Sequence, residues 1–399
     1  MAKNKFAAHY IFTGNGKVYK NGIVVTEKDG TIKEIIDTGG QLPEKANVKF
    51  YSGVIVPGFV NAHCHLELSH LRNTFPEKTG MAEFLSRIVK QREIQEDLIK
   101  EAARIADAEM QRNGIVAVGD IANNPLAFDT KKSSPIQYHT FIEALGFSPA
   151  RADAAFEYTS LLQKKAFALG INASVVPHAP YSISEQLFHK IGELALEQNA
   201  ILTMHNQESK EENELYQTGK GKIAKHIRKN LGIDLKSFHP TGKNSLESVL
   251  PFLPASSQLL LVHNTFTGKE ELDWLHANRD EGKTSLVLCP NSNLFIEDRL
   301  PDVELLRSNG LSICLGTDSL SSNHSLSVLD EMITLHQYFP DIPFGELVQW
   351  ATGNGAKALR MDEQLGTIAP GKKPGLNLIT GMDLQQLKLL SGSRVKRLI

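Results

Sequence analysis

The 399-residue sequence predicts an α/β fold: a (β/α)8 TIM barrel with a small β-sandwich-like domain built from both chain termini. Eight short apolar runs have the composition of buried strands, and segments with helical spacing separate them. Both ends of the chain carry short apolar pieces between turn signals. Eight strands that alternate with helices favour closure into a barrel, although an open doubly wound sheet has the same periodicity.

The eight runs are mostly continuous apolar stretches, as expected of parallel strands that are buried on both faces. Between them, apolar residues recur at helical spacing, for example at Leu187, Ile191, Leu194 and Leu196. The predicted strands are Val54–His65, Ile115–Ile121, Tyr138–Leu145, Ala173–His178, Ile201–Asn206, Leu259–Asn264, Ser285–Pro290 and Ser312–Asp318.

The two ends of the chain differ from the middle. Residues 1–53 read as short strands separated by Asn–Gly, Asp–Gly and Gly–Gly turn signals, and residues 365–380 have the same character. We therefore predict that residues 1–53 and 365–399 form the small β domain, and that residues 54–364 form the barrel.

Composition excludes several classes of protein. The chain has 43 basic and 45 acidic residues without a long single-sign block, so neither a nucleic acid nor a membrane surface is an expected partner. The densest basic cluster is interpreted as a solvated helix face and contains Lys225, His226, Arg228 and Lys229. Three cysteines cannot form a disulfide framework, and the N-terminal residues lack the apolar core of a signal peptide. A cytoplasmic location is expected.

Histidines and one aspartate fall at the ends of the predicted strands. His63 and His65 close the first strand, and their alternate spacing lets both imidazoles face one point. His205 ends the fifth strand and Asp318 the eighth. Barrel enzymes build their sites at the C-terminal ends of the strands, so these four side chains are predicted to converge. Three imidazoles and a carboxylate suit Zn²⁺ best, with Fe²⁺ or Mn²⁺ as alternatives, and leave a position open for water.

Three further polar residues belong to the same predicted mouth. His178 ends the fourth strand, His263 ends the sixth, and Glu208 follows His205 by three residues. Glu208 is one of several acids in HNQESKEENE, so a solvated loop acid is the structural alternative.

The motifs PGFVNAHCHLELSHLR, HAPYSIS, HNQES, VHNTFT, LCPNSNLF and LGTDSLSSN, in this order, resemble the amidohydrolase superfamily. The resemblance is to its mononuclear aminohydrolase branch, which includes adenosine-type, aminodeoxyfutalosine and guanine deaminases and the triazine hydrolases. It implies that His63, His65, His205 and Asp318 hold the metal. Because no lysine ends the fourth strand, it implies one metal ion rather than two.

The resemblance also implies the remaining roles. Glu208 matches a glutamate that moves protons between water, a ring nitrogen and the departing amine. His263 matches a histidine that helps to orient or deprotonate the water. Asp318 is also expected to accept the proton of this water. His178 matches a histidine that contacts the substrate.

Two weaker matches concern the loop after the first strand. Phe84 and Glu93 fall where some adenosine-type deaminases place an aromatic residue against the base and a glutamate on the ribose hydroxyls. The structural alternative for Phe84 is an ordinary apolar helix stripe, and the alternative for Glu93 is an ordinary exposed helix acid. One departure lies in PGKKPGLNLIT, where Asn377 replaces an acid that is frequent in the family.

The sequence thus predicts a metal-dependent aminohydrolase that acts on a small molecule, with adenosine-type substrates favoured. Guanine deamination, dechlorination, cyclic-amide hydrolysis and a non-catalytic barrel protein are the alternatives. Residues 209–258 are expected to be partly helical and to cover the mouth. A homodimer that pairs through the outer helices is compatible with the sequence.

Overall fold

The computed structural model describes residues 4–41 and 47–399. Eight parallel strands form two four-stranded sheets, and each predicted strand has a counterpart among them. The first sheet has the order β6 (Phe59–Cys64), β7 (Ile115–Ala122), β8 (Gln137–Ala144) and β9 (Asn172–Pro177). The second has the order β10 (Leu202–Asn206), β11 (Leu259–His263), β12 (Thr284–Leu288) and β13 (Ser312–Leu315). Their residues are almost all buried, which explains the continuous apolar runs.

The two parallel sheets meet at both of their outer edges. Between β9 and β10, the His205 backbone N–H donates to the His178 carbonyl over 2.9 Å. At the opposite edge, the backbone N–H groups of Thr317 and Asp318 donate to the His63 carbonyl over 3.0 and 3.1 Å. The first and last parallel strands, β6 and β13, therefore lie side by side although they are far apart in the sequence.

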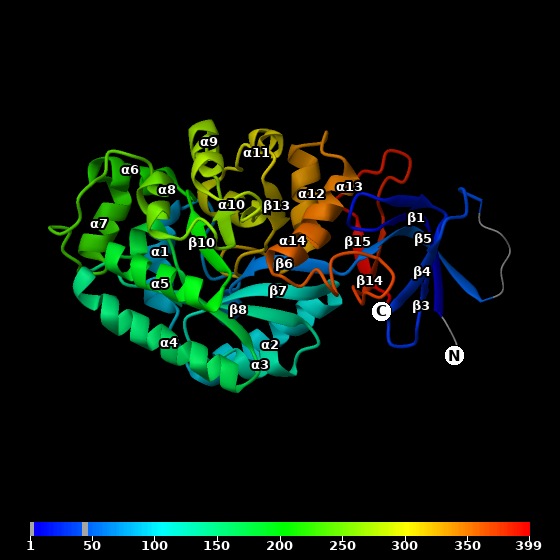
Figure 1. Ribbon diagram of the computed structural model, residues 1–399, viewed down its shortest axis with the longest axis horizontal. Coiled ribbons are helices and arrows are strands. Elements are labelled where there is room, and N and C mark those ends of the chain that lie inside the picture. The colour runs from blue at the N-terminus through cyan, green and yellow to red at the C-terminus, as the bar shows by residue number, and fades with distance from the viewer. Residues whose placement is uncertain (1–3, 42–46) are drawn as a thin grey trace.

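Helices follow most of the strands and cover their outer faces (Figure 1). The α-helices are α1 (Met81–Gln91), α2 (Glu96–Arg112), α3 (Phe128–Ser133), α4 (Ala152–Ala168), α5 (Glu185–Gln198), α6 (Lys210–Thr218), α7 (Gly221–Lys229), α8 (Ser245–Val249), α9 (Lys269–Asn278), α10 (Pro290–Glu297), α11 (Val303–Asn309), α12 (Val328–Tyr338), α13 (Phe344–Gln349) and α14 (Gly355–Ala358). Short 3₁₀ turns are η1 (Leu66–Leu71), η2 (Pro149–Arg151), η3 (Pro180–Ser182) and η4 (Leu250–Phe252), and η5 (Trp350–Asn354) is a π-helical segment. The helical content predicted within residues 209–258 is confirmed by α6, α7 and α8.

Helix α5 shows which part of a predicted apolar stripe was wrong. Leu187 and Ile191 are fully buried, as expected of the stripe, but 56% of Leu196 is exposed. The buried face of the helix continues instead through Ala195, because one residue along a helix rotates the side chain by about 100°.

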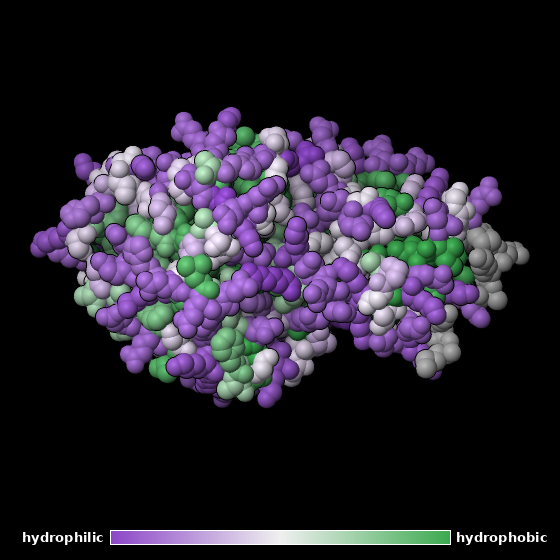
Figure 2. All heavy atoms as spheres, viewed as in Figure 1, coloured by the Kyte–Doolittle hydropathy of each residue, from purple (hydrophilic) through white to green (hydrophobic). Residues whose placement is uncertain are grey.

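Strands from both ends of the chain form one seven-stranded sheet, which lies at one end of the molecule (Figure 1). Its order is β15 (Arg394–Arg397), β14 (Leu376–Thr380), β5 (Val48–Pro57), β1 (Asn4–Phe12), β3 (Ile23–Thr26) and β4 (Ile32–Ile36), with β2 (Val18–Lys20) paired to β1. The predicted pairing of the two ends therefore exists as hydrogen bonds between β14 and β5. Hydrophilic residues cover most of the face seen in Figure 2, with hydrophobic residues gathered over this sheet.

The predicted single strand Val54–His65 is wrong, because the structure divides it at Gly58. Residues before this point belong to β5 of the terminal sheet, and residues after it belong to β6 of the first parallel sheet. A Cβ atom at Gly58 would lie 2.3 Å from Val116 Cγ1 and 2.6 Å from the Pro374 carbonyl. Only glycine permits this close crossing between the two sheets.

Asn377 joins the terminal sheet to the first parallel sheet. Its buried side-chain Nδ2 donates to the carbonyl of Gly114, just before β7, over 2.8 Å. An aspartate at this position would have no N–H to donate, so the departure from the family pattern has a structural reason.

A fully buried ion pair fixes the chain immediately after His65. Lys131 Nζ lies 2.5 Å from Asp120 Oδ2, and both side chains are completely excluded from solvent. Asp120 Oδ1 accepts a hydrogen bond of 2.7 Å from the Leu66 backbone N–H. The pair thereby holds the turn that follows the first two predicted metal ligands.

Removing the positive partner alone is expected to be costly. Lys131→Met should reduce the free energy of unfolding by about 3–5 kcal/mol, because it leaves the Asp120 carboxylate buried without a counter-charge. Urea denaturation measures this loss. The double variant Asp120→Asn/Lys131→Met should lose less, since neither charge then remains. A single variant as stable as the wild type would contradict this account.

Candidate metal centre and active site

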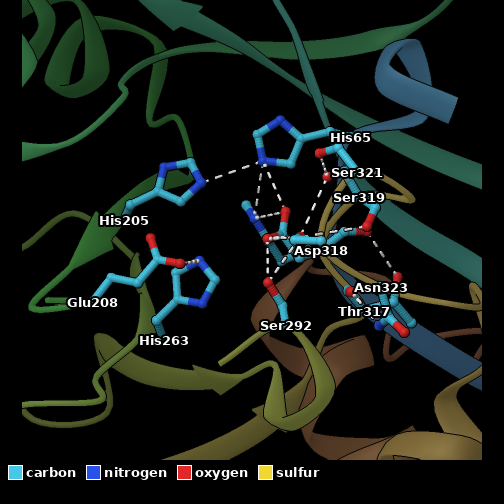
Figure 3. A network of polar contacts seen from close by, with 12 residues as sticks. His65, His205, Glu208, His263, Ser292, Thr317, Asp318, Ser319, Ser321 and Asn323 are labelled. Atoms are coloured by element: carbon cyan, nitrogen blue, oxygen red, sulfur yellow. Dashed lines mark hydrogen bonds and ion pairs between the residues drawn. The ribbon is translucent and has the colours of Figure 1, made fainter. Parts of the chain in front are cut away.

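Four predicted ligand residues lie together at the ends of three strands (Figure 3). His65 Nε2 lies 3.2 Å from His63 Nε2 and 3.3 Å from His205 Nε2. Asp318 Oδ1 lies 3.6 Å from the His63 Nε2 atom and 3.4 Å from the His65 Nε2 atom. The strands β6 and β10 and the turn after β13 therefore bring these four residues together, and His65 Nε2 lies within 3.4 Å of a ligand atom of each of the other three.

The distances and the donor chemistry fit a bound divalent cation. Ligand atoms at 2.0–2.2 Å from a tetrahedral ion lie about 3.3–3.6 Å from one another. The four distances given above, from 3.2 to 3.6 Å, are close to this spacing. Burial lowers the pKa of His65 well below its usual value and that of His205 to about 4, which favours the neutral imidazole that metals require. His205 Nδ1 donates to the His178 carbonyl over 2.8 Å, which leaves Nε2 free to bind a metal.

Asp318 is oriented by two hydroxyl groups. Ser292 Oγ and Ser322 Oγ both donate to Asp318 Oδ2, over 2.6 and 2.8 Å, so that Oδ1 faces the histidines. Burial by itself would raise the pKa of this carboxyl, but hydrogen bonding to His63 holds it well below the usual range. The carboxylate is therefore ionised and presents one oxygen to the cluster.

Glu208 and His263 form a second pair that adjoins Asp318. Glu208 Oε1 lies 3.5 Å from His263 Nε2, and ligand atoms of these two residues and of Asp318 lie within 4.8 Å of one another. Both side chains of the pair are almost fully buried, so the alternative of a solvated loop acid at Glu208 is excluded. Figure 3 shows the Glu208 carboxyl turned toward the His263 ring and the same space as His65 and His205.

The environment of Glu208 favours its acid form. Burial raises the pKa of this carboxyl well above its usual value, and the charges of Asp318, Glu297 and Glu212 raise it further. A carboxyl whose pKa is raised is better suited to give a proton to a reacting atom and to take one back.

The backbone around the site departs from ordinary strand geometry. His263, Asn264 and Asp318 have φ angles of 75°, 55° and 56°, and Gln207 has a φ of 46°. Residues other than glycine adopt this left-handed region rarely, and such strain concentrates at functional sites. The turns direct side chains at three strand ends toward one space.

Three residues, His178, Phe84 and Glu93, were predicted to contact a substrate. His178 Nδ1 pairs with Ser182 Oγ at 2.8 Å, and its ring is 4.8 Å from that of His205. Phe84 packs edge-on against Phe75 in an apolar cluster, and Glu93 is exposed just beyond α1. The packing of Phe84 matches its structural alternative of an ordinary helix stripe, whereas Glu93 is an exposed acid but does not lie in a helix. Contact with a substrate stays a prediction for all three residues.

Sequence reasoning missed the residues that support the site. Ser292 and Ser322 orient Asp318, and Asn293 Nδ2 pairs with His263 Nδ1 at 3.1 Å. Ser292 and Asn293 lie in LCPNSNLF and Ser322 lies in LGTDSLSSN, so the motifs contained them. Their roles depend on which neighbours they meet in space, and a motif does not show that.

Helix α6, which follows Glu208, carries a second buried acid. Glu212 is completely buried, and its Oε1 accepts hydrogen bonds from the Gln207 backbone N–H over 2.9 Å and from Ser245 Oγ over 2.5 Å. Burial raises its pKa from 4.5 to about 7. The protein should therefore lose stability as the pH rises from about 4.5 through about 7, because only the folded state disfavours ionisation of this carboxyl.

The Glu212→Gln variant tests this dependence. Between pH 5 and pH 8 the wild type is expected to lose about 2.5 kcal/mol more of its unfolding free energy than the variant does. Urea denaturation at the two pH values measures the difference. Glu214→Gln, on the exposed side of the same helix, should behave as the wild type does. Equal pH profiles for all three proteins would contradict the raised pKa.

Comparison with known proteins identifies the family. The chain belongs to the amidohydrolase family, whose sequence model matches residues 54–396. The predicted membership of this hydrolase family is therefore confirmed.

Among the described residues, no helix is both long and apolar enough to cross a bilayer.

Several relatives align over most of their length. The chain is 27% identical to an adenosine deaminase of Helicobacter pylori, covering 90% of this chain and 86% of the relative. It is 25% identical to a 5-methylthioadenosine/S-adenosylhomocysteine deaminase of Clostridium tetani, covering 94% and 83%. The crystal structure of Helicobacter pylori aminofutalosine deaminase with methylthio-coformycin has a TM-score of 0.80, at 26% identity, and covers 99% of this chain and 100% of that chain.

Proposed function

We propose that this protein is a metal-dependent aminohydrolase that removes an amino group from an adenosine-type heterocycle. The observation that carries the proposal is the buried acid Glu208, which faces His263 beside the cluster of three histidines and Asp318. The relatives named as deaminases of adenosine, methylthioadenosine and S-adenosylhomocysteine support this substrate class.

In this proposal His63, His65, His205 and Asp318 hold one divalent cation, with zinc favoured by the nitrogen-rich ligand set. The spacing of their ligand atoms and the lowered pKa values of His65 and His205 support the assignment. When bound, such a cation lowers the pKa of a water molecule from about 15.7 toward 7 and so supplies a nucleophile at neutral pH.

The protein's own residues then manage the protons. Glu208 gives a proton to the ring nitrogen adjacent to the attacked carbon, which makes that carbon electrophilic. It then takes up one of the two protons of the water and passes it to the departing amine, so that ammonia leaves, and the second proton of the water restores the acid. His263 and the Asp318 carboxylate receive or orient the proton of the water, and Asn293 holds His263 in position. His178, with Phe84 and Glu93, is assigned to substrate binding.

We further propose that residues 54–364, apart from the end of β5 before Gly58, close into a (β/α)8 barrel and that the two termini make a small domain of their own. Hydrogen bonds at both edges of the parallel sheets support the first part, and the pairing of β14 with β5 supports the second. A barrel explains why polar residues at the ends of sequentially distant strands meet in one mouth.

A substrate panel tests the proposed activity. The purified protein, supplied with Zn²⁺, Fe²⁺ or Mn²⁺, is offered adenosine, methylthioadenosine, S-adenosylhomocysteine and aminodeoxyfutalosine, and ammonia release is measured. At least one of these should be deaminated. Guanine, a chlorinated triazine and a cyclic amide serve as comparisons. Turnover of a comparison compound alone would overturn the adenosine-type assignment but would retain the metal-dependent hydrolase.

A further inference from the structure

A groove lined by lysines separates helices α1 and α7. Lys222, Lys225 and Lys229 follow one another at i, i+3 and i+7 on α7, so they share one face of that helix. Together with Lys90 of α1 they line a groove with a volume of about 470 Å³. The helices lie at the end of the molecule opposite the terminal sheet (Figure 1). Part of the basic cluster interpreted from the sequence as a solvated face therefore lines a concave surface.

The positive charge of the groove is only partly neutralised. Its two acidic residues already have partners, since Glu83 pairs with Arg87 at 3.0 Å and Glu211 pairs with Lys222 at 3.2 Å. Within the described parts of the chain, the other three lysines of the groove form no ion pair. Three ammonium groups that share one concavity repel one another unless an anion lies between them.

The groove also has a polar floor that is held in place. His226 is buried, and its Nδ1 accepts a hydrogen bond from Asn230 Nδ2 over 3.1 Å. The same Asn230 amide donates to Ser86 Oγ of α1 over 3.0 Å, which ties the two helices together. Because Nδ1 accepts a hydrogen bond, the neutral ring carries its proton on Nε2, an atom that has no partner among the described residues. His226 lines the groove and so offers it one N–H donor.

We propose that this groove is a binding site for a multivalent oxyanion of the phosphate class, either free or carried by a larger molecule. Ammonium groups bind phosphate as point charges, and the imidazole N–H adds a directed donor. A single carboxylate would leave two of the three unpaired lysines without a counter-charge. The bound anion would bridge α1 and α7 and would stabilise their contact.

The site is separate from the proposed catalytic centre. None of the predicted metal ligands, and neither Glu208 nor His263, lines the groove. The two sites adjoin through α6, because Glu211 of the groove lies three residues after Glu208. Binding of the anion therefore does not depend on the proposed deaminase activity.

Calorimetric titration of the intact protein with inorganic pyrophosphate at low ionic strength tests the proposal. One equivalent should bind per chain. The variant Lys225→Gln/Lys229→Gln should bind at least about tenfold more weakly, because it loses two of the charges that face the anion. Lys164→Gln/Lys165→Gln on α4 removes the same charge elsewhere and should bind as the wild type does. Unchanged thermal unfolding of both variants would show that they are folded.

Two results would overturn the inference. The first is the absence of saturable binding, and the second is an equal loss of affinity in both double variants, which would indicate diffuse attraction by net charge. A comparison with a nucleoside diphosphate identifies the source of the anion. If the nucleoside diphosphate binds more tightly than pyrophosphate, the ligand is a nucleotide. If the two bind with equal affinity, the ligand is the inorganic anion. Both results support the site.

Discussion

Glu208→Gln is expected to reduce the turnover of an adenosine-type substrate by about 10²–10⁴-fold without removing the metal. The amide has nearly the shape of the acid but cannot give a proton to the ring nitrogen and take one back. Glu208 does not belong to the cluster of three histidines, and its Oε1 lies 3.5 Å from His263 Nε2. Steady-state kinetics and metal analysis of the same preparation measure the two properties independently.

A control distinguishes this role from a general effect of charge on the helix that follows. Glu214→Gln removes an exposed carboxylate from α6, six residues farther along the chain, and should leave kcat unchanged. Near-normal turnover in Glu208→Gln, with full metal content, would remove the proposed proton carrier from the mechanism.

Loss of a predicted metal ligand should have an effect at least as large. Asp318→Ala removes the oxygen that faces the histidines. His65→Ala removes the Nε2 atom that lies within 3.3 Å of the Nε2 atoms of His63 and His205. Each variant is expected to retain little bound metal and to lose more than about 10³-fold in activity, because the water is no longer activated. Metal content per chain, measured by mass spectrometry, is the first readout.

Chelation of the wild-type protein should produce the same loss and should be reversible. Restoring Zn²⁺, Fe²⁺ or Mn²⁺ in turn then identifies which ion supports the highest rate. His189→Gln, on the exposed side of α5, is the matched control and should retain both metal and activity. Full activity of chelated protein, or full metal content in Asp318→Ala, would contradict the proposed centre.

The sequence predicted the elements well because the pattern of each one is local. A parallel strand buried on both faces needs a continuous apolar run, and this requirement holds whatever the strand packs against. The same logic failed at the first strand, where the apolar run continues through Gly58 although the chain passes from one sheet to another. That passage is decided by Val116 and Pro374, which are distant in the sequence.

Some site residues could likewise be recognised from a local pattern, and others could not. His63 and His65 could be recognised from their alternation at a strand end, and Glu208 from its offset to His205. Ser292 and Asn293 could not be assigned, because the hydroxyl and amide groups contact Asp318 and His263 of other segments. Hydrogen bonds between segments carry no periodic signal along the chain.

By itself, the sequence determined the family, the alternation of strands and helices, and the types of side chain at the strand ends, since these follow from local spacing and chemistry. Only the tertiary structure decided which oxygen of Asp318 faces the histidines, that Glu208 is buried rather than solvated, and that four lysines line one groove. The physical reason is that burial and orientation depend on neighbours that the folded chain brings together from distant positions.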